Sequence, residues 1–127
     1  QRAAQFLETL DGRPQAGDLD LGLSGGADML WKVAPPPSLA KRHVLVVDDI
    51  LDEGVTLSAI MQACASQGAK SVKSVVLVDK QHDRKADADF RADYTCLEIP
   101  DRYIFGYGMD YKGYLRNADG IFAVKGQ

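Results

Sequence analysis

The sequence predicts an α/β domain with a central, mainly parallel β-sheet flanked by helices. Two runs of β-branched and leucine residues, 44–47 and 74–78, have the pattern of strands that are buried on both faces. Between them lies a helical stretch with four residues on one face: Leu57, Ile60, Met61 and Cys64. A strand, a helix and a second strand within ~35 residues form a βαβ unit with a right-handed crossover.

The segments before this unit carry weaker patterns. Apolar residues at helical spacing predict a helix over 2–10, which turn residues at 11–14 would end. The Gly- and Asp-rich segment 15–26 has no clear period and is predicted to be a loop. We expect a short strand at 29–33 and a stiff proline-rich connector at 34–38.

The residues after the central helix also have patterns that predict their structure. Gly68 is expected to end the central helix as a C-terminal cap. The charged stretch 81–93 is predicted to be a solvated loop, and 94–98 and 121–124 are predicted to be further strands.

Composition limits the class of protein. The 127 residues fit one domain, 1–127, and the net charge of -3 argues against nucleic acid as the main partner. Cys64 and Cys96 belong to no metal-binding pattern, so we expect buried free thiols in a reducing compartment. No apolar run approaches the ~20 residues of a membrane span, and no signal-peptide pattern opens the chain. We therefore expect a cytoplasmic protein without a membrane partner.

An anion site is predicted where the first buried strand ends. Asp48 and Asp49 lie at the carboxyl edge of the sheet, where open α/β sheets bind ligands. Gly54 allows a backbone conformation that other residues avoid, so amides over 53–56 can converge at a helix N-terminus and attract a phosphate. The Thr56 hydroxyl either donates to that phosphate or caps the helix.

The acids around this loop indicate the kind of ligand. Carboxylates suit a partner that carries hydroxyls and a divalent cation beside its phosphate, such as a sugar phosphate with Mg²⁺. The plainer alternatives are that Asp48 and Asp49 are solvated turn acids or helix caps. Asp52 would then be an acid favoured by the helix dipole.

The stretch VLVVDDILDEGVTL resembles the 5-phosphoribosyl-1-pyrophosphate signature of the type I phosphoribosyltransferases. The resemblance implies that Asp48 and Asp49 contact the ribose hydroxyls, directly or through metal and water. It implies that Asp52 is the general acid/base at N7 of a purine. The 5′-phosphate would be held by four consecutive residues: Glu53, Gly54, Val55 and Thr56.

The stretches LVDKQHDR and IPDRYIFGYGMDYKGYLRN resemble the bacterial hypoxanthine-guanine branch of that family, and the resemblance covers 24–125. It implies a purine pocket in which Lys80 donates to O6, Tyr103 stacks on the base, the Ile104 backbone reads the purine edge and Met109 lies near position 2. Asp110 would approach magnesium and pyrophosphate, and Arg116 would grip pyrophosphate. Without these motifs, Lys80 would be a surface lysine and Tyr103 a core residue. Three further tyrosines are assigned mainly to packing: Tyr107, Tyr111 and Tyr114.

The resemblance implies a purine-salvage enzyme that joins a 6-oxopurine to 5-phosphoribosyl-1-pyrophosphate with Mg²⁺, needs no organic cofactor, and forms a homodimer or homotetramer. Residues 1–23 match the family poorly. Neither its pyrophosphate loop nor the Ser-Tyr pair of its flexible lid is found, so we expect the N-terminal part of the fold to be incomplete.

Three alternatives remain. A receiver domain also carries paired acids after a strand and has a similar length, but its acids lie near the chain start. A regulatory module could bind the sugar phosphate without turnover. A phosphoribosyltransferase could also act on xanthine, adenine or a pyrimidine, although Lys80 disfavours adenine. The sequence does not rank hypoxanthine, guanine and xanthine.

Overall fold

The computed structural model describes residues 2–10, 13–23, 29–33 and 39–127, with side chains from residue 39 onward. The single helix in these residues is α1 (Val55–Ser66). The strands are β1 (Arg2–Leu10), β2 (Arg13–Leu23), β3 (Met29–Val33), β4 (His43–Leu51), β5 (Ser71–Gln81), β6 (Tyr94–Pro100), β7 (Ile104–Phe105) and β8 (Phe122–Ala123).

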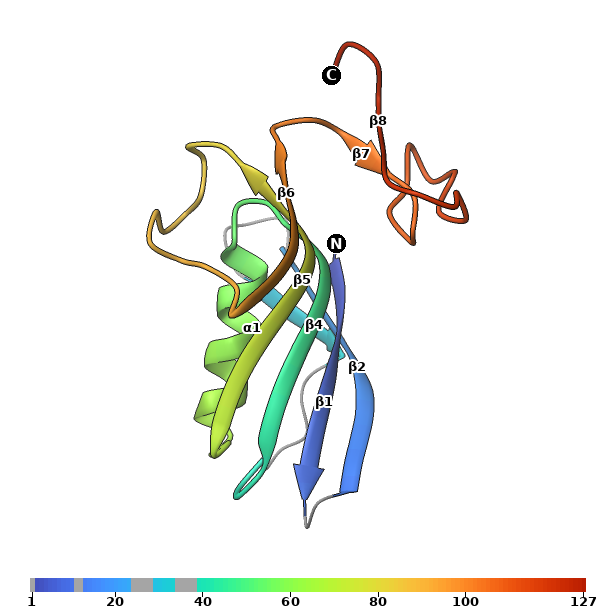
Figure 1. Ribbon diagram of the computed structural model, residues 1–127. Coiled ribbons are helices and arrows are strands. Elements are labelled where there is room, and N and C mark those ends of the chain that lie inside the picture. The colour runs from blue at the N-terminus through green and yellow to red at the C-terminus, as the bar shows by residue number, and fades with distance from the viewer. Residues whose placement is uncertain (1, 11–12, 24–28, 34–38) are drawn as a thin grey trace.

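Six strands form one twisted sheet in the order β3-β2-β1-β4-β5-β6, and β7 pairs with β8 apart from it (Figure 1). Strand β5 runs parallel to both β4 and β6, with the crossover helix α1 between β4 and β5, so the predicted βαβ unit is confirmed. The pairings among β1, β2, β3 and β4 are antiparallel. Parallel pairing is thus confined to β4, β5 and β6, because parallel neighbours need a long connection such as the one that contains α1.

Two of the N-terminal predictions are wrong. The segment 2–10 is a strand rather than a helix, and most of the segment predicted to be a loop, 15–26, belongs to β2. Residues of β1 pair on one side with β2 and on the other with β4, where Gln5 lies opposite Val47. This long-range pairing overrides a weak local periodicity. The strand at 29–33 is confirmed, and the connector predicted at 34–38 lies outside the described residues.

The strands and the helix predicted between residues 43 and 98 are present in the structure. Strands β4, β5 and β6 extend the predicted segments, and α1 begins at Val55 and is followed by Gly68 with a φ of 86°. The last predicted strand, 121–124, is shorter and consists of Phe122–Ala123.

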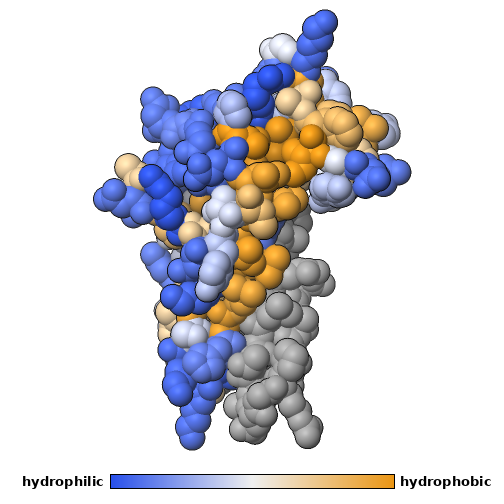
Figure 2. All heavy atoms as spheres, viewed as in Figure 1, coloured by the Kyte–Doolittle hydropathy of each residue, from blue (hydrophilic) through white to orange (hydrophobic). Residues whose placement is uncertain are grey.

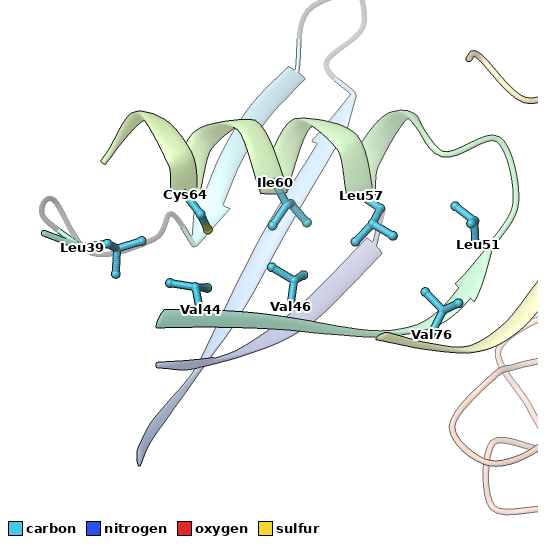
Figure 3. Close-up of a cluster of buried hydrophobic side chains, with 8 residues drawn as sticks. All are labelled: Leu39, Val44, Val46, Leu51, Leu57, Ile60, Cys64 and Val76. Atoms are coloured by element: carbon cyan, nitrogen blue, oxygen red, sulfur yellow. The ribbon is translucent and has the colours of Figure 1, made fainter. Parts of the chain in front are cut away.

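Helix α1 packs its apolar face on β4 and β5 (Figure 3). Leu57, Ile60 and Cys64 point from the helix toward Val44 and Val46 of β4. Each large aliphatic side chain buried in this way stabilises the fold by roughly 1.5–3 kcal/mol. This packing fixes the N-terminus of α1 beside the carboxyl end of β4.

The two cysteines differ in environment. Cys64 is buried as expected, but Cys96 is exposed, and the expectation of a second buried thiol is wrong. Cys96 lies on β6, which is the edge strand of the sheet, where side chains have neighbours on one side only.

A second apolar cluster attaches the C-terminal segment, residues 101–127, to the sheet. Val78 of β5 packs with Ile104 and Met109. Figure 2 shows a band of hydrophobic residues that runs over the viewed side of the sheet toward this segment. Tyr107 and Tyr114 are exposed, so the prediction that they serve mainly in packing is wrong. No described helix is long and apolar enough to cross a membrane.

Candidate functional site

The carboxyl ends of β4 and β5, the start of α1 and the β5–β6 connection meet at one end of the sheet (Figure 1). Asp48 shares the buried face of β4 that α1 covers and is only 6% exposed. Asp49 points to the other face and is half-buried, and its amide donates to Asp48 Oδ1 at 2.8 Å. The two acids therefore present their carboxylates on different sides of the strand end, as their alternation predicts.

The loop between β4 and α1 has the backbone of an anion site. Gly54 precedes the helix with φ 85° and ψ -2°, and no side chain caps this helix end or places an acid in its first turn. The first amides of a helix lack intrahelical acceptors, so those of Val55 and Thr56 remain available to an anion. Thr56 is the second helical residue and does not cap the helix.

Phe90 and the exposed side of α1 form a cavity of about 350 Å³ beside this loop. Its wall includes Glu53, Gly54 and Val55 but not the predicted purine-binding residues. A Cβ atom on Gly54 would lie 3.1 Å from Phe90 Cδ1, so a larger residue would crowd this ring and would also be strained by the φ of 85°.

Asp52 and Lys80 come together although they are far apart in the sequence. Lys80 Nζ lies 3.6 Å from Asp52 Oδ2, with the lysine side chain 12% exposed and the aspartate 39% exposed. The other oxygen, Oδ1, lies 2.5 Å from His82 Nε2 and 4.0 Å from an Arg84 nitrogen. His82 was given no role in the sequence interpretation.

A buried ion pair lies under this group. Lys85 Nζ is 2.8 Å from Asp79 Oδ1, and the two side chains are only 7% and 5% exposed. The same ammonium donates to the backbone oxygens of Lys80 at 2.9 Å and Asp52 at 3.2 Å. Lys85 therefore joins the end of β5 to the β4–α1 loop, and the 81–93 segment is not merely solvated as predicted.

An exposed ion pair links the site to the segment that follows β6. Arg84 donates both terminal nitrogens to Asp101, at 2.5 and 3.0 Å. The hydrogen bonds from Arg84 lower the pKa of Asp101, and the carboxylate in turn raises the pKa of Arg84. Both residues are solvent-exposed, so the pair contributes more to orientation than to stability.

The C-terminal segment holds the remaining predicted site residues. Tyr103 is 41% exposed and meets Tyr111 edge to face, with ring centroids 5.6 Å apart. Ile104 and Met109 are buried in the second apolar cluster.

Asp110 and Arg116 face each other across a turn in this segment. Their nearest atoms are 3.4 Å apart, and Asp110 Oδ2 also accepts the Gly113 amide at 2.6 Å. Arg116 donates to the Gly108 carbonyl at 2.8 Å while remaining 60% exposed. These contacts hold both side chains in place and leave the Arg116 guanidinium open to solvent.

No group of three or more His, Cys, Asp or Glu side chains is arranged to hold a metal ion within the described part of the chain. The carboxylates of this site are instead distributed along the sheet edge and the C-terminal turn. Hard cations such as Mg²⁺ often take only one or two protein carboxylates and fill the remaining positions with water and substrate oxygens.

The chain is similar to known proteins in sequence and in fold. The profile of the phosphoribosyl transferase domain family matches residues 15–112. A hypoxanthine-guanine phosphoribosyltransferase from Bacillus subtilis is 41% identical over 88 residues, which are 69% of this chain and 48% of that protein. The chain spans about half the length of the curated relatives it matches.

Solved structures show the same similarity. A hypoxanthine phosphoribosyltransferase from Staphylococcus aureus superimposes with a TM-score of 0.75 at 32% identity, over 84% of this chain and 60% of that chain. The Leishmania tarentolae enzyme in complex with GMP gives a TM-score of 0.64 at 36% identity, over 70% of this chain and 51% of that chain.

Proposed function

Because the chain belongs to the phosphoribosyl transferase domain family, we propose that it transfers the phosphoribosyl group of 5-phosphoribosyl-1-pyrophosphate to hypoxanthine or guanine and releases pyrophosphate. The similarity to hypoxanthine-guanine phosphoribosyltransferases supports this substrate class. The observation that carries the proposal is the pairing of Lys80 with Asp52 at the carboxyl edge of the sheet.

A 6-oxopurine presents O6 and N7 side by side on one edge, both as hydrogen-bond acceptors in their unprotonated form. An ammonium 3.6 Å from a carboxylate oxygen matches that edge, since Lys80 can donate to O6 while Asp52 exchanges a proton at N7. The amino group of adenine would instead face the donor of Lys80. This pairing therefore supports hypoxanthine and guanine as substrates over adenine.

The C-terminal segment supplies the other contacts to the base. Tyr103 has an exposed ring that can stack on the purine. The Ile104 backbone and Met109, both in the apolar cluster, would read the rest of the ring. Arg116 would bind pyrophosphate through its exposed guanidinium fork.

The sugar phosphate would occupy the loop before α1. Its 5′-phosphate would accept hydrogen bonds from the backbone and hydroxyl groups of Glu53, Gly54, Val55 and Thr56, because the helix N-terminus lacks a side-chain cap. Asp48 and Asp49 would meet the ribose hydroxyls, directly or through metal and water.

Mg²⁺ fits this donor set as an ion shared with the substrate. Asp110 has a partly exposed carboxylate, and Asp49 is half-buried at the strand end. These residues, with Asp48, would hold the ion, which supplies charge neutralisation for the leaving pyrophosphate. The chain itself would bind and align the two reactants, and Asp52 would hold or accept the N7 proton.

The proposal also covers the oligomeric state of the protein and its location in the cell. A homodimer or homotetramer is supported by exposed apolar side chains on the edge strand β6, Tyr94 and Leu97. A cytoplasmic location is supported by the free thiols of Cys64 and Cys96.

The test is pyrophosphate release by the full-length protein with 5-phosphoribosyl-1-pyrophosphate, Mg²⁺ and each purine in turn. Asp52→Asn should lower kcat by about 10²–10⁴-fold, because it removes the proton acceptor, while binding of the sugar phosphate changes little. The exposed residue Asp119 provides the control Asp119→Asn, which should keep full activity. Absence of release with every 6-oxopurine would refute the activity, and equal losses of turnover and binding would refute the role of Asp52.

A further inference from the structure

His82 has a buried side chain although it lies in a stretch of charged and exposed residues. Its side chain is only 2% exposed, and its Nε2 lies 2.5 Å from Asp52 Oδ1. The hydrogen-bond partners of a ring this deeply buried, in contact with the proposed acid/base Asp52, determine its tautomer.

The second ring nitrogen identifies that tautomer. The backbone N–H of Arg84 donates to His82 Nδ1 at 3.0 Å. A backbone N–H can only donate, so Nδ1 carries a lone pair rather than a proton. The ring is therefore neutral, its proton is on Nε2, and Nε2–H donates to Asp52 Oδ1.

The two oxygens of Asp52 consequently have different surroundings. Oδ1 accepts from His82 and has Arg84 at 4.0 Å, whereas Oδ2 lies toward Lys80 at 3.6 Å. Rotation of the carboxylate would break its bond to the buried ring. The residue also cannot move far as a whole, because Lys85 holds its carbonyl at 3.2 Å.

We propose that His82 is a positioning residue, which fixes the Asp52 carboxylate so that Oδ2, beside Lys80, is the oxygen that meets N7 of the base. This inference rests on the proposed function and adds to it a residue that acts through Asp52 without touching substrate. His82 would orient the carboxylate in the way that a hydrogen-bonding partner orients the base in other catalytic sites. There, misplacement of the reacting group by about 1 Å can cost ~10²-fold in rate.

Two variants separate this role from simple packing. The Nε2 amide of Gln in His82→Gln reaches the place of the ring Nε2–H, so it can still donate to Asp52 Oδ1. His82→Leu fills similar space but donates nothing. With saturating hypoxanthine, kcat of His82→Leu should fall about ten- to a hundredfold. The KM for 5-phosphoribosyl-1-pyrophosphate should stay within about twofold, and His82→Gln should recover most of kcat.

The ring itself offers a readout that does not need turnover. A long-range ¹H–¹⁵N NMR spectrum of the full-length protein at neutral pH should show His82 neutral with its proton on Nε2. A ring protonated on Nδ1 would overturn the inference.

The kinetic outcomes are equally distinct. Two outcomes with an active wild type overturn the positioning role alone. In the first, His82→Leu keeps its kcat. In the second, His82→Gln and His82→Leu lose kcat equally and both lose affinity for the sugar phosphate. A wild type that releases no pyrophosphate with any 6-oxopurine overturns the proposed function, and the positioning role fails with it. Melting temperatures of both variants identify loss of fold.

Discussion

The buried pair of Lys85 and Asp79 allows a sharp prediction of stability. The ammonium has three oxygen acceptors: Asp79 Oδ1 at 2.8 Å and the carbonyls of Lys80 and Asp52 at 2.9 and 3.2 Å. Lys85→Met keeps the length of the side chain but leaves the Asp79 carboxylate buried without its cation. Such a change costs about 3–5 kcal/mol, a large share of the ~5–15 kcal/mol that stabilises a typical domain.

The assay is urea unfolding followed by circular dichroism, with midpoints and slopes compared between variants. Lys73 provides the control, because its pair with Asp93 spans 3.8 Å and the two side chains are 57% and 33% exposed. Lys73→Met should therefore cost no more than ~1 kcal/mol.

A double variant completes the cycle. Lys85→Met combined with Asp79→Leu removes both charges, so it should be clearly more stable than Lys85→Met alone. A stabilising role for the buried pair is refuted if Lys85→Met costs no more free energy of unfolding than Lys73→Met, or if removal of the Asp79 charge restores none of the loss.

Two further predictions concern the loop and the exposed ion pair. Gly54→Ala and Gly126→Ala both place a side chain at a positive φ, 85° and 80°, which costs roughly 1–2 kcal/mol each, but only the former comes close to a neighbouring side chain, Phe90. Gly54→Ala alone should raise the KM for 5-phosphoribosyl-1-pyrophosphate, and equal KM changes in both variants would contradict the assigned loop. Arg84 lowers the pKa of Asp101 from its ordinary 3.8, so its stabilisation is present above that pH and is lost as the pH falls through the lower folded-state pKa. Unfolding free energies of wild type and Arg84→Gln should differ at pH 7 and converge in strong acid, and a difference that grows toward acid would contradict this sign.

The central part of the fold could be predicted because its signals are local. Strand β4, the loop around Gly54 and helix α1 follow one another within 24 residues, 43–66, and each has its own pattern of apolar, glycine or helical residues. Their spatial arrangement then follows from the handedness of the crossover. The same local patterns brought Asp48, Asp49 and the loop amides to one edge.

The N-terminal strands could not be predicted in this way. The apolar residues of 2–10 fit one face of a helix, but pairing with β4 decides their conformation. That pairing joins residues about 40 positions apart, and nothing in the segment itself encodes it. The exposure of Cys96 follows from the edge position of β6, which is likewise a property of the whole sheet.

The polar residues that organise the site were missed for a related reason. His82 and Lys85 lie in a charged stretch that has the composition of a solvated loop. They are buried because their partners, Asp52 and Asp79, lie at the ends of two neighbouring parallel strands. A lysine or histidine becomes a site residue through such partners, and those partners emerge only from the three-dimensional register of β4 and β5.

The most direct test of the proposed site is a crystal structure of the full-length protein with bound IMP. We expect the nucleotide phosphate on the amides that begin α1, with O6 at Lys80 and N7 at Asp52. A nucleotide bound elsewhere, or one whose phosphate does not touch the residues from Glu53 to Thr56, would contradict it.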